Sequence, residues 1–237
     1  MKYKCMAAIL LFAFVQQAFA DTLTLTKEED KLSYAAGVDV GKTIKYQEIK
    51  LNEKAFIQGL RDAINGTDPQ MTRQEIRDVL TRHRQTLVAK RAEAFKQKAV
   101  DNQKKSQAFL AQNKTRDGVV TLKNGLQYRI ISEGNGPKPT LKDTVEVKYT
   151  GRLVNGTVFD STERTGKAVT IRLTDVIPGW TQVLQLMREG STWEVFIPAK
   201  LAYGERGVGG PIGPNQALIF NIQLIKVNAG AAGKRKS

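Results

Sequence analysis

Five aromatic residues and a few short motifs between Tyr149 and Phe220 are the part of this chain that could do chemistry. The motifs are YTGRL, NGTVFDST, VIPGW, LAYGERG and GPIGPN, and they carry Tyr149, Phe159, Trp180, Tyr203 and Phe220. This set predicts a concave aromatic pocket with few hydrogen-bonding groups. It offers no nucleophile paired with a base, no set of metal ligands and no phosphate-binding loop. Such a pocket suits a reaction that breaks no covalent bond, such as rotation about a peptide bond before proline.

The segments around these motifs predict a mostly antiparallel sheet with one short helix. Asn124-Gly125 and Asn155-Gly156 are turn signals between runs of alternating apolar and polar residues. We expect strands at 119–122, 126–131, 145–149, 152–154, 157–159, 170–173, 192–197 and 217–227, and a helix over 181–187. The fold class predicted for residues 118–227 is therefore α+β.

Three helices are predicted over residues 26–113. Their ends are marked by Thr26 with Glu29, by Asn52, by Gly66, and by Thr72 with Glu75. The third helix, over 72–113, has no proline or glycine and is polar nearly all round over residues 89–106, which is typical of a helix that bridges two domains. His83, the only histidine, falls on its apolar side and is expected to be structural.

The helices of residues 21–71 and half of the long helix make a poor hydrophobic core. Pairing with a second copy of the chain would cover their apolar faces, so we expect a helical dimerisation domain over 21–71 and a homodimer. The alternative is a compact monomer in which the long helix folds back. The whole chain is then an all-helical N-terminal region, a long connecting helix over 72–113, and a C-terminal antiparallel sheet wrapped on a short helix.

The first 20 residues resemble a secretory signal peptide. Lys2 and Lys4 precede an apolar run over 6–15, and Ala18-Phe19-Ala20 forms a small-x-small cleavage site. The alternative is a short buried helix that stays attached. Cys5, the only cysteine, lies in this segment, so the mature chain would have neither disulfides nor a catalytic thiol. Export predicts a location in the periplasm, on the outer membrane surface or outside the cell.

The net charge of +14 is spread along the chain, and the basic tail over 228–237 is predicted to be disordered. A dedicated nucleic-acid-binding protein concentrates positive charge on one face or helix, so we expect no such function. Peripheral association with membranes or other anionic surfaces is the expectation that the charge does support.

Residues 118–227 closely resemble an FKBP-type peptidyl-prolyl cis-trans isomerase domain, because YTGRL, FDST, VIPGW, LAYG and IGPN occur in the family's order. The helical half, with KLSYAAGVDVGK and then NGLQYRI, resembles the macrophage infectivity potentiator (Mip) group, in which this region serves for dimerisation. The resemblance implies an isomerase that needs no cofactor or metal. It also implies binding of proline-containing polypeptides and of macrolide inhibitors of the FKBP class.

The same resemblance implies roles for individual residues. Asp160 and Tyr203 would be catalytic. The Tyr203 hydroxyl would donate to the carbonyl beside proline, and Asp160 at the rim would either polarise the site or orient Tyr203 and Arg164. The Ile177 N–H would hold a substrate carbonyl, and Trp180 would form the pocket floor. The substrate-binding residues would be Tyr149, Phe159, Arg164, Ile171, Val176, Ile177, Trp180, Ile212 and Phe220. Family members often carry phenylalanine at the position of Ile171, which would widen this pocket. No role is assigned to Asp175.

Two other functions stay open at this stage. The chain could be a chaperone or surface adhesin that binds proline-containing segments while catalysis is incidental. Electrostatic attachment to nucleic acid or anionic polymers would instead predict binding that falls steeply with salt and survives loss of the pocket.

Overall fold

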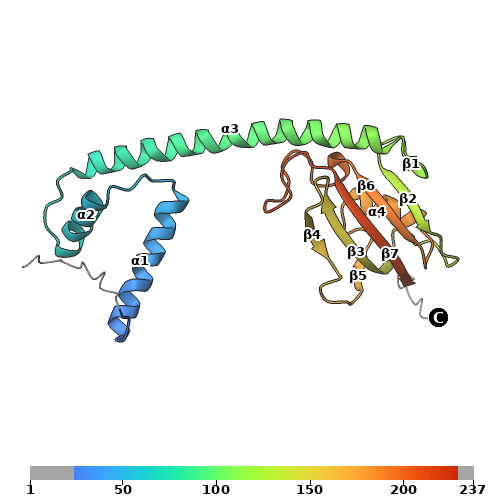
Figure 1. The fold of residues 1–237 in the computed structure, drawn as a ribbon, viewed down its shortest axis with the longest axis horizontal. Helices are drawn as coiled ribbons and strands as arrows, with labels where there is room; N and C mark the ends of the chain where they lie inside the picture. The colour runs from blue at the N-terminus through green and yellow to red at the C-terminus, as the bar shows by residue number, and fades with distance from the viewer. Residues whose placement is uncertain (1–23, 229–237) are drawn as a thin grey trace, which may run out of the picture. The chain divides into compact units, whose positions relative to one another are not determined.

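The computed structural model describes residues 24–228. The predicted signal peptide, over 1–20, and nearly all of the predicted tail lie outside the described residues. The chain divides into two compact units, residues 1–87 and residues 88–237, and the boundary between them falls inside the long helix (Figure 1). Each unit therefore has its own internal packing.

The first unit contains α1 (Glu28–Tyr46), α2 (Glu53–Asn65) and the beginning of α3 (Arg73–Asn113). Three predicted helix ends are present as expected. The Asn52 side chain accepts a hydrogen bond from the Ala55 N–H, Gly66 adopts the left-handed conformation at φ 66°, and Thr72 and Glu75 form a reciprocal capping box. The predicted capping box at Thr26 is wrong, because the N-cap of α1 is Lys27 and no side chain caps it.

The first unit has almost no hydrophobic core of its own. Neither α1 nor α2 has a buried residue. His83 Nε2 lies 2.7 Å from the Gln47 carbonyl oxygen and so joins α3 to the end of α1, which agrees with a structural histidine. Large apolar side chains that are more than 40% exposed include Leu32, Tyr34, Tyr46, Leu60, Ile64 and Leu80. This unit therefore leaves apolar surface for another partner to cover.

The second unit is built on a seven-stranded antiparallel sheet. Its strands are β1 (Val119–Thr121), β2 (Gln127–Ser132), β3 (Thr144–Leu153), β4 (Val158–Ser161), β5 (Val169–Arg172), β6 (Thr192–Ile197) and β7 (Leu218–Asn228). The order is β1-β2-β6-β7-β3-β4, and β5 also pairs with β3 (Figure 1). The segments 145–149 and 152–154, which we predicted as two strands, form the single strand β3. A short 3₁₀ helix, Ala199–Leu201, follows β6.

The helix α4 (Pro178–Leu186) packs against one face of this sheet and completes the core. It begins three residues earlier than predicted, since proline is favoured in the first turn, where its missing N–H costs nothing. Gly179 allows the close approach of helix and sheet, because a Cβ there would lie 2.5 Å from Cγ2 of Ile197. The fully buried apolar side chains of this core include Leu126, Val145, Val147, Leu173, Val183, Leu184, Met187, Val195, Ile197, Leu218, Ile222 and Leu224.

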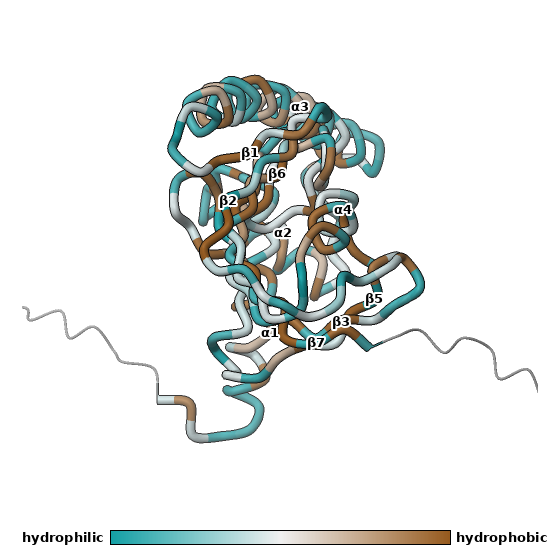
Figure 2. Tube along the Cα trace, turned by 90° about the vertical axis from the view of Figure 1, so that its right-hand side faces the viewer, coloured by the Kyte–Doolittle hydropathy of each residue, from teal (hydrophilic) through white to brown (hydrophobic). Residues whose placement is uncertain are grey.

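The C-terminal half of α3 docks on the sheet through polar groups. Figure 2 shows that α3 is mostly hydrophilic. Asn113 is nevertheless only 1% exposed, and its amide donates to Gln127 Oε1 at 2.8 Å while Gln127 Nε2 donates to the Leu110 carbonyl oxygen. Phe109 packs on Phe196 of β6 with ring centroids 5.9 Å apart. Most residues of this stretch are exposed to solvent, and the buried Asn113 forms its hydrogen bond with the sheet.

A charge cluster around the buried Glu194 lies on the same face of the sheet as Phe196, opposite α4. Glu194 on β6 accepts hydrogen bonds from Arg129 of β2 at 2.9 Å and from Arg152 of β3 at 2.5 Å. Burial by itself raises the pKa of Glu194, but the hydrogen bonds and positive charges of both arginines outweigh it and the pKa is lowered. This carboxylate consequently stabilises the folded sheet in its ionised form.

Among the described helices, none has a stretch long and apolar enough to cross a bilayer.

Candidate active site

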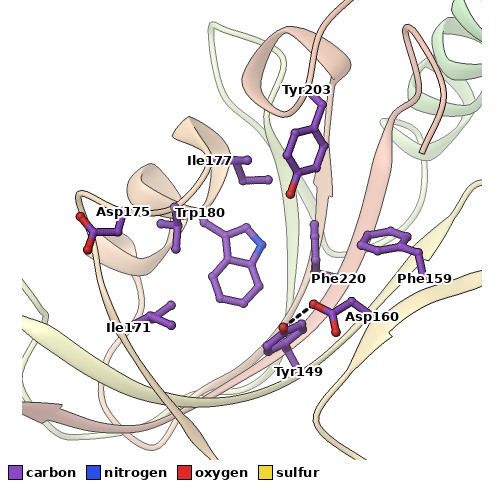
Figure 3. A pocket seen from close by; sticks show the side chains of 10 residues that line it. Tyr149, Phe159, Asp160, Ile171, Asp175, Ile177, Trp180, Tyr203 and Phe220 are labelled. Carbon is purple, nitrogen blue, oxygen red and sulfur yellow. Dashed lines mark hydrogen bonds between the residues drawn. The ribbon is translucent and has the colours of Figure 1, made fainter. Parts of the chain in front are cut away.

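A cavity of about 390 Å³ opens between the sheet and the N-terminal end of α4 (Figure 3). Its walls come from β3, β4, β5 and β7, from the turn that leads into α4, and from the segment after β6. The lining residues are Tyr149, Phe159, Asp160, Ile171, Asp175, Val176, Ile177, Trp180, Tyr203 and Phe220. All five aromatic residues singled out in the sequence therefore meet in one cavity.

The aromatic rings of the cavity are packed edge to face. The Trp180 ring lies 5.0 Å from Tyr149 at an interplanar angle of 87°, and 5.2 Å from Phe220 at 86°. Phe159 meets Phe220 at 5.6 Å and 87°. Each such pair contributes about 0.5–1.5 kcal/mol beyond the area that it buries. Trp180 is only 5% exposed, so its ring forms the buried base of the cavity and is held in place by the rings around it.

Gly151 and a β-bulge bring two consecutive residues of β4 onto this wall. Asp160 pairs with Gly151, and the next pair joins Val158 to Arg152, which leaves Phe159 as the extra residue. A bulge of this kind re-aims side chains, so both Phe159 and Asp160 line the cavity. Phe220 pairs with Gly151 from the other side. A Cβ on Gly151 would lie 2.7 Å from both phenylalanine rings, so only glycine leaves room for them.

Asp160 is hydrogen-bonded to Tyr149 rather than to the residues that we expected. The Tyr149 hydroxyl donates to Asp160 Oδ2 at 2.5 Å (Figure 3). Burial, followed by this bond and the charge of Asp160, raises the pKa of Tyr149 well above its usual range. Tyr149 is therefore a neutral donor at any physiological pH. Within residues 24–228, no hydrogen bond joins Asp160 to Tyr203 or Arg164.

Two hydrogen-bond donors remain available at the cavity. Tyr203 is 37% exposed, and Figure 3 shows its hydroxyl directed into the cavity. In the described part of the chain, that hydroxyl and the backbone N–H of Ile177 donate to no protein acceptor. Ile177 is also the N-cap of α4, where the helix dipole favours the approach of a carbonyl oxygen. The cavity thus pairs apolar walls with two free donors.

Known proteins similar to this chain agree with that chemistry. The family model of FKBP-type peptidyl-prolyl cis-trans isomerases matches residues 136–225, and the model of the domain amino-terminal to such isomerases matches residues 29–130. The outer membrane protein MIP of Legionella longbeachae is 49% identical over 233 residues, which cover 98% of this chain and 100% of that protein. The peptidyl-prolyl cis-trans isomerase Mip of Coxiella burnetii is 47% identical over 203 residues, covering 86% of this chain and 88% of the relative.

The chain belongs to the FKBP-type peptidyl-prolyl cis-trans isomerases of the Mip group. The crystal structure of FkpA from Escherichia coli is similar to this Mip-group isomerase, with a TM-score of 0.68 and 32% identity, over 87% of this chain and 100% of that one. The predicted family, fold class and enzyme class are thereby confirmed.

Two predicted site residues of the isomerase do not line the cavity. Arg164 is exposed on the segment after β4. Ile212 is 6% exposed, and its carbonyl oxygen accepts from the Val208 N–H within the loop 207–214. Asp175, to which we assigned no role, does line the cavity and accepts a hydrogen bond from Thr174. Its position in the turn before α4 follows from the early start of that helix, which sequence spacing did not indicate.

The described residues contain no group of three or more histidine, cysteine, aspartate or glutamate side chains that could hold a metal ion. The carboxylates of the cavity are Asp160 and Asp175, and Asp160 is engaged by Tyr149.

Proposed function

We propose that this isomerase accelerates rotation about X–Pro bonds in exported or extracellular client proteins, and that it acts as a homodimer. The proposal rests foremost on one observation, the apolar aromatic cavity into which the Tyr203 hydroxyl and the Ile177 N–H are free to donate. A volume of about 390 Å³ is within the range of small-ligand sites and suits a proline ring with its neighbours.

Rotation about an X–Pro bond can be accelerated by an apolar cavity with a few hydrogen-bond donors. Turning a peptide bond costs about 18–20 kcal/mol, because amide resonance is lost. The twisted amide is less polar than the planar one, so an apolar site favours the transition state over the ground state. Each ~1.4 kcal/mol gained in this way accelerates the rotation tenfold. No proton moves, so the carboxylate of Asp160 is not a general base.

We assign the polar residues as follows. The Ile177 N–H holds the carbonyl oxygen of the substrate residue, and the Tyr203 hydroxyl donates to the carbonyl beside the proline. Asp160 holds the Tyr149 hydroxyl, which fixes the Tyr149 ring against Trp180 at the base of the cavity. Ile171 lines the cavity where many family members have phenylalanine, and the wider wall should accept bulky residues before proline. Macrolide inhibitors of the FKBP class are expected to bind the same cavity.

The N-terminal unit supports a homodimer. Its helices α1 and α2 bury no residue, and apolar side chains such as Leu60 and Ile64 are 47% and 74% exposed. Exposed apolar surface of this extent on small helices is covered in most proteins by association. Two cavities on one dimer could bind one client chain at two proline sites, which raises avidity without new contacts.

Export is supported by the sequence of residues 1–20 and by the similarity to the outer membrane protein MIP of Legionella longbeachae. Clients in that location would be unfolded or partly folded chains with slow X–Pro bonds, which isomerise in tens to hundreds of seconds without catalysis.

The direct test is the cis-to-trans rate of a short X–Pro peptide, measured with protein from Asp21 onward. The wild type is compared with an Asp160→Leu, Tyr203→Ala double variant and with Tyr203→Phe. We expect acceleration by the wild type that the double variant nearly loses. An equal rate for wild type and double variant would refute the assigned pocket. A wild type that binds proline peptides without any acceleration would instead support the chaperone or adhesin alternative.

The dimer is tested by sedimentation equilibrium of the wild type and of a Leu60→Asp, Ile64→Asp variant. We expect twice the monomer mass for the wild type and the monomer mass for the variant. The peptide isomerisation rate per chain should be equal in both, because the cavity lies within one chain. A monomeric wild type would refute the dimer and leave the isomerase assignment intact.

A further inference from the structure

The segment that carries Tyr203 is joined to the long helix α3 through Asn215. The Asn215 N–H donates to the Gly204 carbonyl oxygen at 2.9 Å, directly after Tyr203 in the chain. The Asn215 carbonyl oxygen accepts from the Ser106 hydroxyl at 2.9 Å. The Asn215 side-chain amide donates to the Ala99 carbonyl oxygen at 3.3 Å. One residue therefore connects the Tyr203 segment with two positions on the helix.

Ser106 is the central group of this connection. It is 7% exposed, and its hydroxyl both donates to Asn215 and accepts from the Ala217 N–H at 2.8 Å. One turn earlier, the Asn102 amide donates to the Pro214 carbonyl oxygen at 2.8 Å. The helix thus forms hydrogen bonds with three of the four residues of 214–217, the stretch that leads into β7 and Phe220.

The backbone held in this way is one that needs external support. Asn215 has φ 56°, in the left-handed region that residues other than glycine adopt rarely. Gly204, at φ 59°, adopts this region without strain because it has no Cβ. Meanwhile the Tyr203 hydroxyl forms no hydrogen bond within residues 24–228, so no side-chain contact of that group fixes its direction. The direction of the Tyr203 hydroxyl therefore depends on where the backbone places the residue.

We propose that Ser106 and Asn215 are positioning residues for the isomerisation and that α3 is part of the catalytic apparatus. They act by holding the Gly204 carbonyl oxygen and thereby the Tyr203 hydroxyl at the substrate. The inference rests on the proposed role of Tyr203. It assigns a catalytic purpose to polar residues of a helix that sequence analysis treats as a connector.

The test is a double-mutant cycle on the full mature chain, with a proline peptide as substrate. Ser106→Ala is measured alone and in the Tyr203→Phe background, and Gln107→Ala, one position along the same helix, is the control. We expect Ser106→Ala to lower kcat about three- to tenfold with little change in KM, since misplaced catalytic groups lose effectiveness steeply. In the Tyr203→Phe background, Ser106→Ala should lower kcat by less than about twofold. The hydroxyl that Ser106 positions is then absent, so the effects of the two substitutions are not additive.

Each outcome decides the matter. Equal losses in both backgrounds, or no loss from Ser106→Ala, would overturn the positioning role while leaving Tyr203 catalytic. Full activity of Tyr203→Phe itself would remove the proposed role of Tyr203, and the inference with it. If Ser106→Ala does not fold, Asn102→Ala takes its place in the cycle. As a second readout, the ring signals of ¹³C-labelled Tyr203 should shift in Ser106→Ala and stay in place in Gln107→Ala, and unmoved signals in both would overturn the inference.

Discussion

Replacing Gly151 by alanine should loosen the aromatic wall of the cavity. The new Cβ would lie 2.7 Å from Cζ of Phe159 and 2.7 Å from Cε1 of Phe220, whereas ordinary contact begins near 3.4 Å. Both rings must therefore retreat by about 0.7 Å, the difference of these values. Overpacking of this kind costs about 1–3 kcal/mol, and an alanine in a strand returns less than about 1 kcal/mol through the unfolded chain. We expect the free energy of unfolding to fall by about 1–2 kcal/mol.

The assay is urea unfolding followed by tryptophan fluorescence, paired with the rate of peptide isomerisation. Both tryptophans, Trp180 and Trp193, lie in the unit that contains the cavity, so the signal reports on that unit alone. Because Phe159 and Phe220 also line the cavity, kcat/KM should fall as well, and a tenfold fall would correspond to ~1.4 kcal/mol of lost transition-state stabilisation.

A second substitution separates this explanation from general damage. Phe159→Leu removes the ring atoms that the new Cβ would meet, so it should restore part of the stability of Gly151→Ala while it destabilises the wild type. An unchanged urea midpoint in Gly151→Ala, or additive losses in the double variant, would refute the reasoning from ring contact.

Three further predictions follow from charges and caps. Tyr149 stays protonated because burial and Asp160 raise its pKa, so Tyr149→Phe should leave the growth of phenolate absorbance up to about pH 11 unchanged. The folded-state pKa of Glu194 is lowered, so its contribution to stability is present above the ordinary value of 4.5 and is lost as the pH falls through the folded value. Glu194→Gln should therefore lower the urea midpoint at pH 7, and the gap to wild type should narrow as the pH falls below 4.5. Thr72→Ala removes a capping box and should destabilise the start of α3 by about 1 kcal/mol, measured as faster amide exchange in its first turn.

The features predicted most accurately from the sequence are those that depend only on residues close together in the chain. The cap at Asn52, the capping box at Thr72 and the hairpin at Asn155-Gly156 are local hydrogen-bonding patterns that few alternatives can satisfy. The residues of the aromatic cavity were also predictable, because family motifs mark them. Thr26 failed as a cap because the spacing alone does not decide which residue first becomes helical.

The features that could not be predicted from the sequence depend on strand register and on contacts between residues far apart in the chain. Asp160, which donates no proton but accepts the hydrogen bond of the Tyr149 hydroxyl, lies beside a bulge at Phe159, and nothing in the alternation of β4 marks that bulge. Ser106 and Asn113 look like surface residues of a polar helix, since their partners lie about 110 and 14 residues away. Residues that bond across such separations are found only when the sheet itself has been placed.

The topology of the sheet has a consequence for how the isomerase comes into being. The strand β7 is the last of the described strands in the sequence, yet it lies in the middle of the sheet between β6 and β3. A polypeptide that emerges from its N-terminus onward can therefore form the hairpins of β1 with β2 and of β3 with β4, but not the cavity. Closing the sheet requires strand pairs such as Gly151 with Phe220, which are far apart in the chain. The entropy lost in closing the loop between such residues slows this step. Catalytic competence should thus arrive in one late step, after residue 228 has been made, and an incomplete chain cannot assist its own prolines.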